Sequence, residues 1–203
     1  MMTRRFPDCV PLLRDGRVLL RAHRADDLPA IVEQCNDVDM LRYTTVPRPY
    51  GPDQAAEFLA RVKSAWEDRS SEALRCWAVS TVEKPNVLAG TIDYRPDGAG
   101  MAVVGFGLHP AWRGRRLMSA ALGLVADHAF STGVEVLQWR AVAGNWASAK
   151  TAWRSGFRLE GQIRGLCSIP GSPPVDGWIA TLCRGDGRQP CQPWPWSIGS
   201  AVG

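Results

Sequence analysis

Residues 109–122, "HPAWRGRRLMSAAL", place an arginine-rich turn between the apolar stretch "MAVVGFGL" (101–108) and a helical pattern. The pattern predicts a helix from Gly114 to about Phe130, with one stripe formed by Leu117, Ala121, Leu124, Val125 and His128. The first amides of a helix are unpaired and lie at the positive end of its dipole, where anions bind. Gly114 lets a ligand approach the backbone, and the arginines around it suit a pyrophosphate. Taken alone, the segment is explained equally well as a solvated basic turn.

The composition predicts one globular domain. The chain has 203 residues, of which 45% are hydrophobic and 22% charged, and no apolar run is long enough to cross a bilayer. Pro7, Asp8 and Pro11 interrupt what would have to be the apolar core of an export signal. The six cysteines include no C-x-x-C pair and no close histidine, so we expect reduced thiols, no metal site and a cytoplasmic protein. The net charge of +4 is mild and does not identify a partner.

The remaining patterns predict a mixed α/β fold. Apolar periodicity and turn residues predict strands at 17–22, 75–82, 87–94, 101–108, 135–142, 157–164 and 174–183. They predict helices at 26–35, 53–69, 114–130 and 145–156. The order along the chain is therefore strand, two helices, three strands, helix, strand, helix and two strands. Tight-turn residues between the three middle strands predict an antiparallel meander. We divide the chain into an N-terminal extension (1–16), one domain (17–184) and a tail rich in proline and tryptophan (185–203).

A second motif, "GNWASAKTAWRSGF" at 144–157, gives the arginine turn a specific meaning. With both motifs, the chain resembles the GNAT acetyltransferases, which are acetyl-coenzyme A dependent N-acyltransferases. Within them it resembles the RimJ/RimL-type branch that acetylates N-terminal amines of ribosomal proteins. The family's R/Q-x-x-G-x-G/A loop corresponds to 113–118, and its N-x-x-S motif with a following lysine and G-F corresponds to Asn145, Ser148, Lys150, Gly156 and Phe157. The resemblance covers roughly residues 17–184 and implies a mostly antiparallel central sheet flanked by helices.

The resemblance also implies where acetyl-coenzyme A lies. The cofactor would occupy a split between strands 101–108 and 135–142, with its pyrophosphate on the amides of 113–118. Asn145 would hold the pantetheine arm, and Ser148 would lie near the sulfur as a proton donor or hydrogen-bond partner. The expected cofactor-binding residues are Leu108, Arg113, Gly114, Arg115, Arg116, Leu117, Met118, Asn145, Ser148 and Lys150. Asn145 and Ser148 also fit the N-cap and first turn of a helix, and these roles are compatible with cofactor contact.

Two loop positions depart from the family pattern. Arg116 stands where the motif has its second glycine, and Met118 where it has a final glycine or alanine. A cradle made of backbone amides tolerates Arg116 if its φ is negative and its side chain points outward. Met118 either crowds the cofactor or turns into the core beneath the helix.

The proton acceptor is not evident from the sequence. Many relatives have a glutamate at the position of Val103, and this strand has no carboxylate between residues 101 and 108. Acetyl transfer needs a neutral amine and a proton for the departing thiolate. Among the remaining side chains, His109 and Glu160 are candidate catalytic residues, with Asp93 and Tyr94 as further alternatives near strand ends. An amine that arrives partly deprotonated would need no strong base.

The preferred hypothesis is acetyl transfer from acetyl-coenzyme A to a primary amine, either a protein N-terminus or a small molecule, by direct attack. Val103 and Met118 motivate an alternative, a cofactor-binding or regulatory module with little turnover. A nucleic-acid module using "RGRR" is disfavoured because no aromatic residues interleave with the basic ones. We expect no nucleic-acid or membrane partner, and a homodimer formed through the last strands or the tail is compatible with the sequence.

Overall fold

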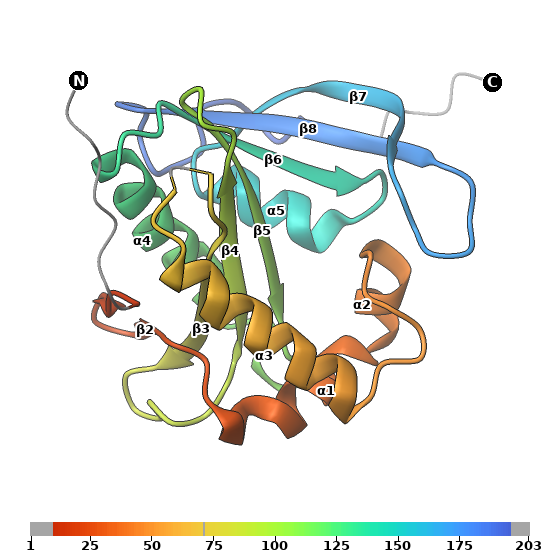
Figure 1. Ribbon diagram of the computed structural model, residues 1–203. Coiled ribbons are helices and arrows are strands. Elements are labelled where there is room, and N and C mark those ends of the chain that lie inside the picture. Colours follow the sequence, from red (N-terminus) through yellow and green to blue (C-terminus); the bar gives the residue numbers. More distant parts are fainter. Residues whose placement is uncertain (1–9, 71, 196–203) are drawn as a thin grey trace.

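One central sheet carries helices on both of its faces (Figure 1). The computed structural model describes residues 10–70 and 72–195, and in that part of the chain the strand order is β1-β2-β3-β4-β5-β6-β8-β7. The strands are Leu13–Arg14 (β1), Val18–Arg21 (β2), Arg75–Thr81 (β3), Gly90–Pro96 (β4), Met101–Leu108 (β5), Val136–Val142 (β6), Arg158–Cys167 (β7) and Val175–Cys183 (β8). The α-helices are Leu28–Cys35 (α1), Val38–Tyr43 (α2), Pro52–Glu67 (α3), Leu117–Ser131 (α4) and Trp146–Arg154 (α5).

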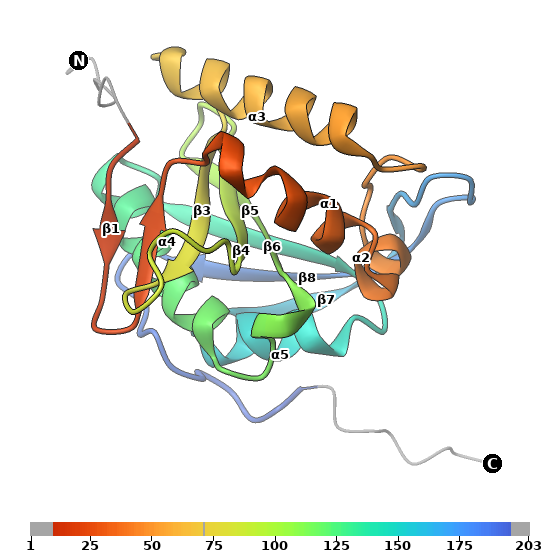
Figure 2. The same ribbon diagram turned by 90° about the horizontal axis from the view of Figure 1, so that it is seen from below.

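The helices divide between the two faces of the sheet. Figure 2 shows α1 and α3 on one face and α4 and α5 on the other. The α4 helix packs on β2, β4 and β5, and it buries Ala121, Leu122 and Val125 completely. On the opposite face, α3 buries only Ala55, Val62 and Trp66 and leaves a polar surface to solvent. Most of the core therefore lies between the sheet and α4.

The sheet contains a fork between β5 and β6. These strands are parallel, and they pair only from Met101 to Val104 on β5 and from Val136 to Trp139 on β6. Past these residues, Gly105–Leu108 still pairs with β4 but no longer with β6. The split expected between these two strands is therefore present, and it exposes strand edges that a ligand can use.

The expected order of elements is confirmed, including the antiparallel meander of β3, β4 and β5. Two short elements were not expected, β1 and α2. The predicted start of α4 at Gly114 was wrong, because Gly114 and Arg116 have φ values of 77° and 59° and a right-handed helix begins only after them. The short α2 helix is set up by Asp37, whose Oδ1 accepts from the amides of Asp39 and Met40.

Residues 185–195 form no helix or strand, and they pack along α5. The indole N–H of Trp153 donates to the carbonyl of Gln192 at 2.9 Å, and the rings of Trp153 and Trp194 meet edge to face at 5.3 Å. Trp196, the last tryptophan of the tail, lies outside the described residues. Among the described helices, none has the length and apolarity needed to cross a membrane.

Candidate active site

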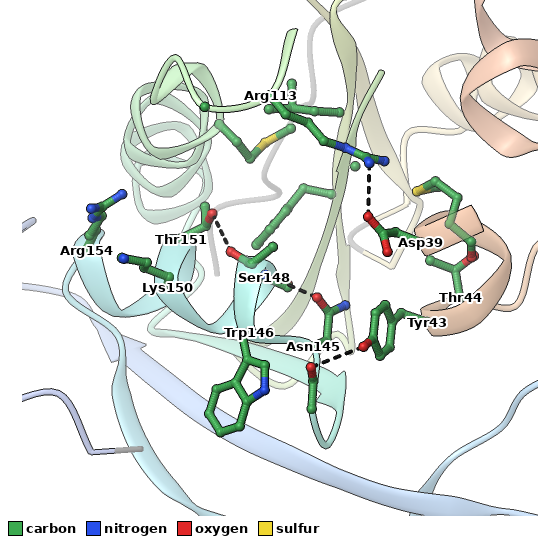
Figure 3. Close-up of a pocket in the computed structure, with 18 residues that line it drawn as sticks. Asp39, Tyr43, Thr44, Arg113, Asn145, Trp146, Ser148, Lys150, Thr151 and Arg154 are labelled. Carbon is green, nitrogen blue, oxygen red and sulfur yellow. Dashed lines mark hydrogen bonds and ion pairs between the residues drawn. The ribbon is translucent and has the colours of Figure 1, made fainter. Parts of the chain in front are cut away.

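A groove of about 460 Å³ opens where β5 and β6 separate. Figure 3 shows its walls: Arg113 reaches in from the loop before α4, Asp39 and Tyr43 from α2, and Asn145 and Ser148 from the start of α5. The expected cofactor-binding residues that line the groove are Leu108, Arg113, Gly114, Met118, Asn145, Ser148 and Lys150. The structure thus brings both sequence motifs to one cavity, although they are separated by a strand and a helix.

The loop at 113–118 presents its backbone to the groove. Gly114 has open space around it, since an added Cβ would meet nothing within 4 Å. The α4 helix has no side-chain cap at Arg116, and among the described residues no hydrogen bond uses the amides of 114–116 as donors. These amides and the first turn of α4 are available to an anion.

Arg116 corrects one expectation. Its φ of 59° and ψ of 18° lie in the left-handed region, whereas a negative φ was the condition under which an arginine was expected to be tolerated. The loop therefore keeps the glycine-like backbone of the family motif without its glycine. The Arg116 side chain is exposed, as expected, so the cradle shape is preserved at the cost of backbone strain of about 1 kcal/mol.

Two guanidinium groups of the loop, those of Arg113 and Arg115, contact other side chains. Arg113 forms ion pairs with Asp37 and with Asp39, the latter at 3.0 Å. Burial alone would raise the pKa of the Asp37 carboxyl group, but hydrogen bonds, chiefly the one from Arg113, lower this pKa below its usual value. Arg115 lies over the ring of Trp112 at 5.0 Å. Arg113 therefore shares its charge with two carboxylates, and the contribution of these arginines to a pyrophosphate site stays a prediction.

Met118 and Leu117 belong to the core. Their side chains are 4% and 5% exposed and pack with the cluster beneath α4. Met118 also lines the groove, whereas Leu117 does not, so Leu117 can contact a ligand only through its backbone amide. Of the two alternatives for Met118, the structure favours the one in which its side chain turns into the core.

Asn145 and Ser148 help to form the start of α5, and each keeps a side-chain hydrogen-bond donor that no described residue uses. The Oδ1 of Asn145 accepts from the amide of Ser148 at 3.2 Å, which makes Asn145 the N-cap of α5. The indole N–H of Trp139 donates to the Oγ of Ser148 at 3.0 Å. Because an indole is only a donor, this contact leaves the Ser148 hydroxyl proton to donate elsewhere. Likewise, the Nδ2 of Asn145 has no partner among the described residues.

Basic residues and α2 mark the two ends of the groove. Lys150 and Arg154 lie along α5 near the α4 side (Figure 3). Arg154 was not expected, although its position one helical turn after Lys150 places both on the same side of α5. At the other end, the Tyr43 hydroxyl donates to the carbonyl of Gly144 at 3.2 Å. The α2 helix therefore contacts both sides of the fork, through the Asp39–Arg113 ion pair and the Tyr43–Gly144 hydrogen bond.

His109 and Glu160, two of the four candidate proton acceptors, do not line the groove. His109 Nδ1 accepts from the amide of Ala111 at 3.3 Å, and its Nε2 lies 3.0 Å from a carboxylate oxygen of Glu33. Both ring nitrogens are therefore occupied in a turn-capping arrangement. Glu160 is exposed on β7, where hydrogen bonds from Thr181 and Arg158 lower the pKa of its carboxyl group. Both side chains thus have protein partners outside the groove, and their catalytic role stays a prediction.

Tyr94 does not line the groove either. Its hydroxyl lies 3.2 Å from His128 Nδ1 on α4 and 3.3 Å from Oγ1 of Thr132, the residue that follows α4. It is fully buried in the core.

The geometry agrees with a comparison of the sequence with known families. The profile described as "Acetyltransferase (GNAT) domain" matches residues 17–158, which cover the fork and both motifs. The chain belongs to the GNAT acetyltransferases. The predicted family, fold class and reaction class are thereby confirmed: this protein is an acetyltransferase that uses acetyl-coenzyme A and an amine acceptor. Among the described residues, no group of acidic, histidine and cysteine side chains could hold a metal ion.

Solved structures share the fold. A GNAT-family acetyltransferase from Chromobacterium violaceum is 24% identical over 89% of each chain, with a TM-score of 0.71. The microcin C7 self-immunity acetyltransferase MccE, solved with acetyl-CoA and AMP, is 16% identical over 83% of this chain and 93% of its own, with a TM-score of 0.72. RimL, the ribosomal L7/L12 alpha-N-protein acetyltransferase, is 17% identical over 86% and 94%, with a TM-score of 0.73. No curated protein matches the chain.

Proposed function

We propose that acetyl transfer takes place in the groove of Figure 3, from acetyl-coenzyme A bound across the start of α4 to a primary amine that enters beside α2. One observation carries this proposal: the uncapped start of α4, the open edge of β5 and the unused donors of Asn145 and Ser148 all face one cavity.

The cradle fits the phosphates of acetyl-coenzyme A. The amides of 114–118 and the dipole of α4 favour the pyrophosphate, and Lys150 and Arg154 add two cations on the facing helix. Leu108 lies at the splayed end of β5, where backbone groups no longer used by β6 suit the amides of the pantetheine arm. Asn145 Nδ2 supplies a further donor to that arm. When bound, acetyl-coenzyme A supplies the activated acetyl group.

Ser148 is the proposed proton donor to the departing thiolate. Trp139 fixes the Ser148 oxygen as an acceptor at 3.0 Å, so the hydroxyl proton points away from Trp139. The residue is held at the first turn of α5 by the Asn145 cap, which limits the motion of its side chain.

The acceptor enters from the α2 side. Asp39, Tyr43 and Thr44 line that end of the groove, and Trp146 beside it is 50% exposed. Such an open, mixed polar and aromatic entrance accommodates an amine carried on a peptide or on a small molecule. RimL acts on the N-terminus of a ribosomal protein, and MccE was solved with AMP, so both kinds of acceptor belong in the test.

The location and assembly that the sequence predicts remain part of this proposal. The described cysteines are free, in keeping with a reducing cytoplasm. In the described sheet β7 is an edge strand, and its unpaired side offers a surface on which a second copy could form a homodimer.

A free-thiol release assay tests the function. Wild-type protein with acetyl-coenzyme A should release coenzyme A thiol in the presence of peptides with free N-termini or of small primary amines, and N-blocked versions of the same acceptors should give only the background rate. Binding of acetyl-coenzyme A without thiol release over the whole panel would instead support the alternative, a binding or regulatory module.

A further inference from the structure

A buried carboxylate lies beside the fork on the strand next to β5. Asp93 on β4 is paired with Gly105 on β5, and the Asp93 side chain is only 14% exposed. A Cβ added at Gly105 would lie 3.2 Å from both carboxylate oxygens. The carboxylate therefore extends across β5 in the space that the missing Gly105 side chain leaves open.

Gly105 is also the first residue of β5 beyond the fork. Val104 is the last β5 residue paired with β6, and Gly107, two residues further on the same face of the strand, lines the groove. Neighbouring strands lie about 4.8 Å apart, and two residues along a strand span roughly 6.6 Å. Asp93 itself does not line the groove, and its carboxylate over Gly105 is roughly 6.6 Å along the strand from Gly107, so a proton would reach it through water rather than by direct contact.

The carboxylate lacks the contacts expected of a purely structural group. Its Oδ1 accepts no hydrogen bond among the described residues, although Arg95 lies 3.2 Å away as an ion-pair partner. Arg95 itself is 62% exposed, so solvent screens this pair. A buried, incompletely satisfied carboxylate costs stability, and such groups persist where they are needed for function.

We infer that Asp93 is the proton acceptor for the attacking amine, in place of the carboxylate that β5 lacks at Val103. This inference rests on the acetyl transfer proposed above. It places the base on β4, directly across from the glycine at which the fork opens.

The proposed step balances as follows. The amine nitrogen forms a bond to the carbonyl carbon of the thioester and gives one proton to the Asp93 carboxylate through water. The carbon–sulfur bond breaks, and the departing thiolate takes a proton from the Ser148 hydroxyl group. The products are an amide and the free thiol, and solvent restores the protonation of Asp93 and Ser148.

The charged surroundings suit a base at neutral pH. Burial raises the pKa of Asp93 to about 6, while Arg95 on the same strand and Arg61 on α3 lower it. Cys76 on β3 also faces the carboxylate, and burial keeps its thiol protonated by raising its pKa well above the usual value. Gly105 contributes no charge from β5. The carboxylate is therefore mostly ionised at pH 7 and still close to the pKa at which general bases work best.

The test compares Asp93→Asn with wild type over pH 5 to 8. For wild type, kcat at saturating amine should rise as Asp93 loses its proton near pH 6. For Asp93→Asn, kcat at pH 7 should fall by about 10- to 100-fold and this rise should vanish, while the Kd for acetyl-coenzyme A stays within about twofold. The melting temperature at pH 7 should stay equal or increase, because the variant removes a buried charge.

Two further variants make the outcome specific. Glu83→Gln removes an exposed carboxylate in the turn between β3 and β4, changes the net charge equally, and should leave kcat and its pH profile unchanged. Gly105→Ala adds one methyl group that must displace the Asp93 carboxylate, so kcat should fall while the pH-dependent rise persists.

Either of two results would overturn the inference: wild-type kcat in Asp93→Asn, or a reduced kcat whose rise near pH 6 persists together with a lower melting temperature. A wild-type protein that releases no thiol with any amine would refute the proposed function itself, and this inference with it. An active wild type with an unaffected Asp93→Asn would refute only the role of Asp93.

Discussion

At the scale of single residues, the partners of each side chain limit what it can do in the groove. Ser148 is held by Trp139 but keeps a hydroxyl proton, whereas His109 has both ring nitrogens occupied. The sequence predicts Asn145 and Ser148 because they match the N-x-x-S motif of the family that the chain resembles. It does not predict that Arg113 pairs with Asp37, since those residues lie 76 positions apart.

Removal of the Ser148 hydroxyl tests its proposed role as donor. Ser148→Ala should lower kcat by about 10- to 100-fold, because the thiolate must then take its proton from water. The Kd for acetyl-coenzyme A should change by less than about twofold, since cradle and arm contacts remain. Steady-state thiol release and calorimetry measure the two quantities. A kcat equal to that of wild type would contradict the donor role.

The left-handed backbone of Arg116 gives a prediction about stability. Arg116→Gly should raise the free energy of unfolding by up to about 1 kcal/mol, because glycine adopts a φ of 59° without strain. Arg115 has no positive φ, so Arg115→Gly is the matched control and should lower stability by roughly 0.5–1 kcal/mol. Urea unfolding of both variants checks this, and equal changes would argue against strain at Arg116.

At the scale of elements, long periodic segments were predictable and short ones were not. The apolar stripes of α3 and α4 and the meander of β3 to β5 are evident in the sequence because burial repeats along them. The α2 helix has six residues and none of them is buried, so it leaves no periodic signal. Yet α2 forms one wall of the groove, and its position comes from contacts to Arg113 and Gly144.

The turn after α5 joins that helix to the segment at 185–195. Gly156 has a φ of 91°, and a Cβ there would lie 2.1 Å from the carbonyl oxygen of Gly187. Gly156→Ala should therefore lower the free energy of unfolding by at least about 2 kcal/mol. Gly144→Ala has a similar φ of 94° but open space, and it should cost only about 1 kcal/mol. Equal losses in thermal or urea unfolding would show that the contact with Gly187 is unimportant.

At the scale of the whole molecule, the fold was predictable from the sequence, whereas the choice of Asp93 among the candidate proton acceptors was not. Strand order and the fork follow from family motifs and strand patterns. The juxtaposition of Asp93 with Gly105 depends on the register between β4 and β5, which residue types alone do not specify. For that reason the sequence offered His109 and Glu160 as candidates and Asp93 and Tyr94 only as further alternatives.

Two half-buried histidines, His23 and His128, predict how stability depends on pH. Burial lowers the pKa values of His23 and His128 from 6.5 to about 4. Between these values the unfolded chain binds protons that the folded chain does not, so stability falls as pH decreases from about 6.5 to 4. The raised pKa of Asp93 has the opposite effect, because the folded chain then binds a proton more tightly than the unfolded chain, but only one group contributes in this direction.

His128→Gln should therefore flatten the dependence of melting temperature on pH between 4 and 6.5. The Gln variant retains a polar group near the Tyr94 hydroxyl, so the comparison reports on the protonation of His128. A wild-type melting temperature that rises on acidification through this range would contradict the assignment.

The central claim is that acetyl-coenzyme A binds across the start of α4, on the backbone around Gly114. A calorimetric titration with acetyl-coenzyme A tests it most directly, with wild type, Gly114→Val and Arg116→Gly compared side by side and folding checked by circular dichroism. We predict one site with a Kd of about 1–100 μM for wild type, at least about tenfold weaker binding for Gly114→Val, and near-wild-type binding for Arg116→Gly. No heat of binding at high micromolar acetyl-coenzyme A, or stronger loss in Arg116→Gly than in Gly114→Val, would contradict it.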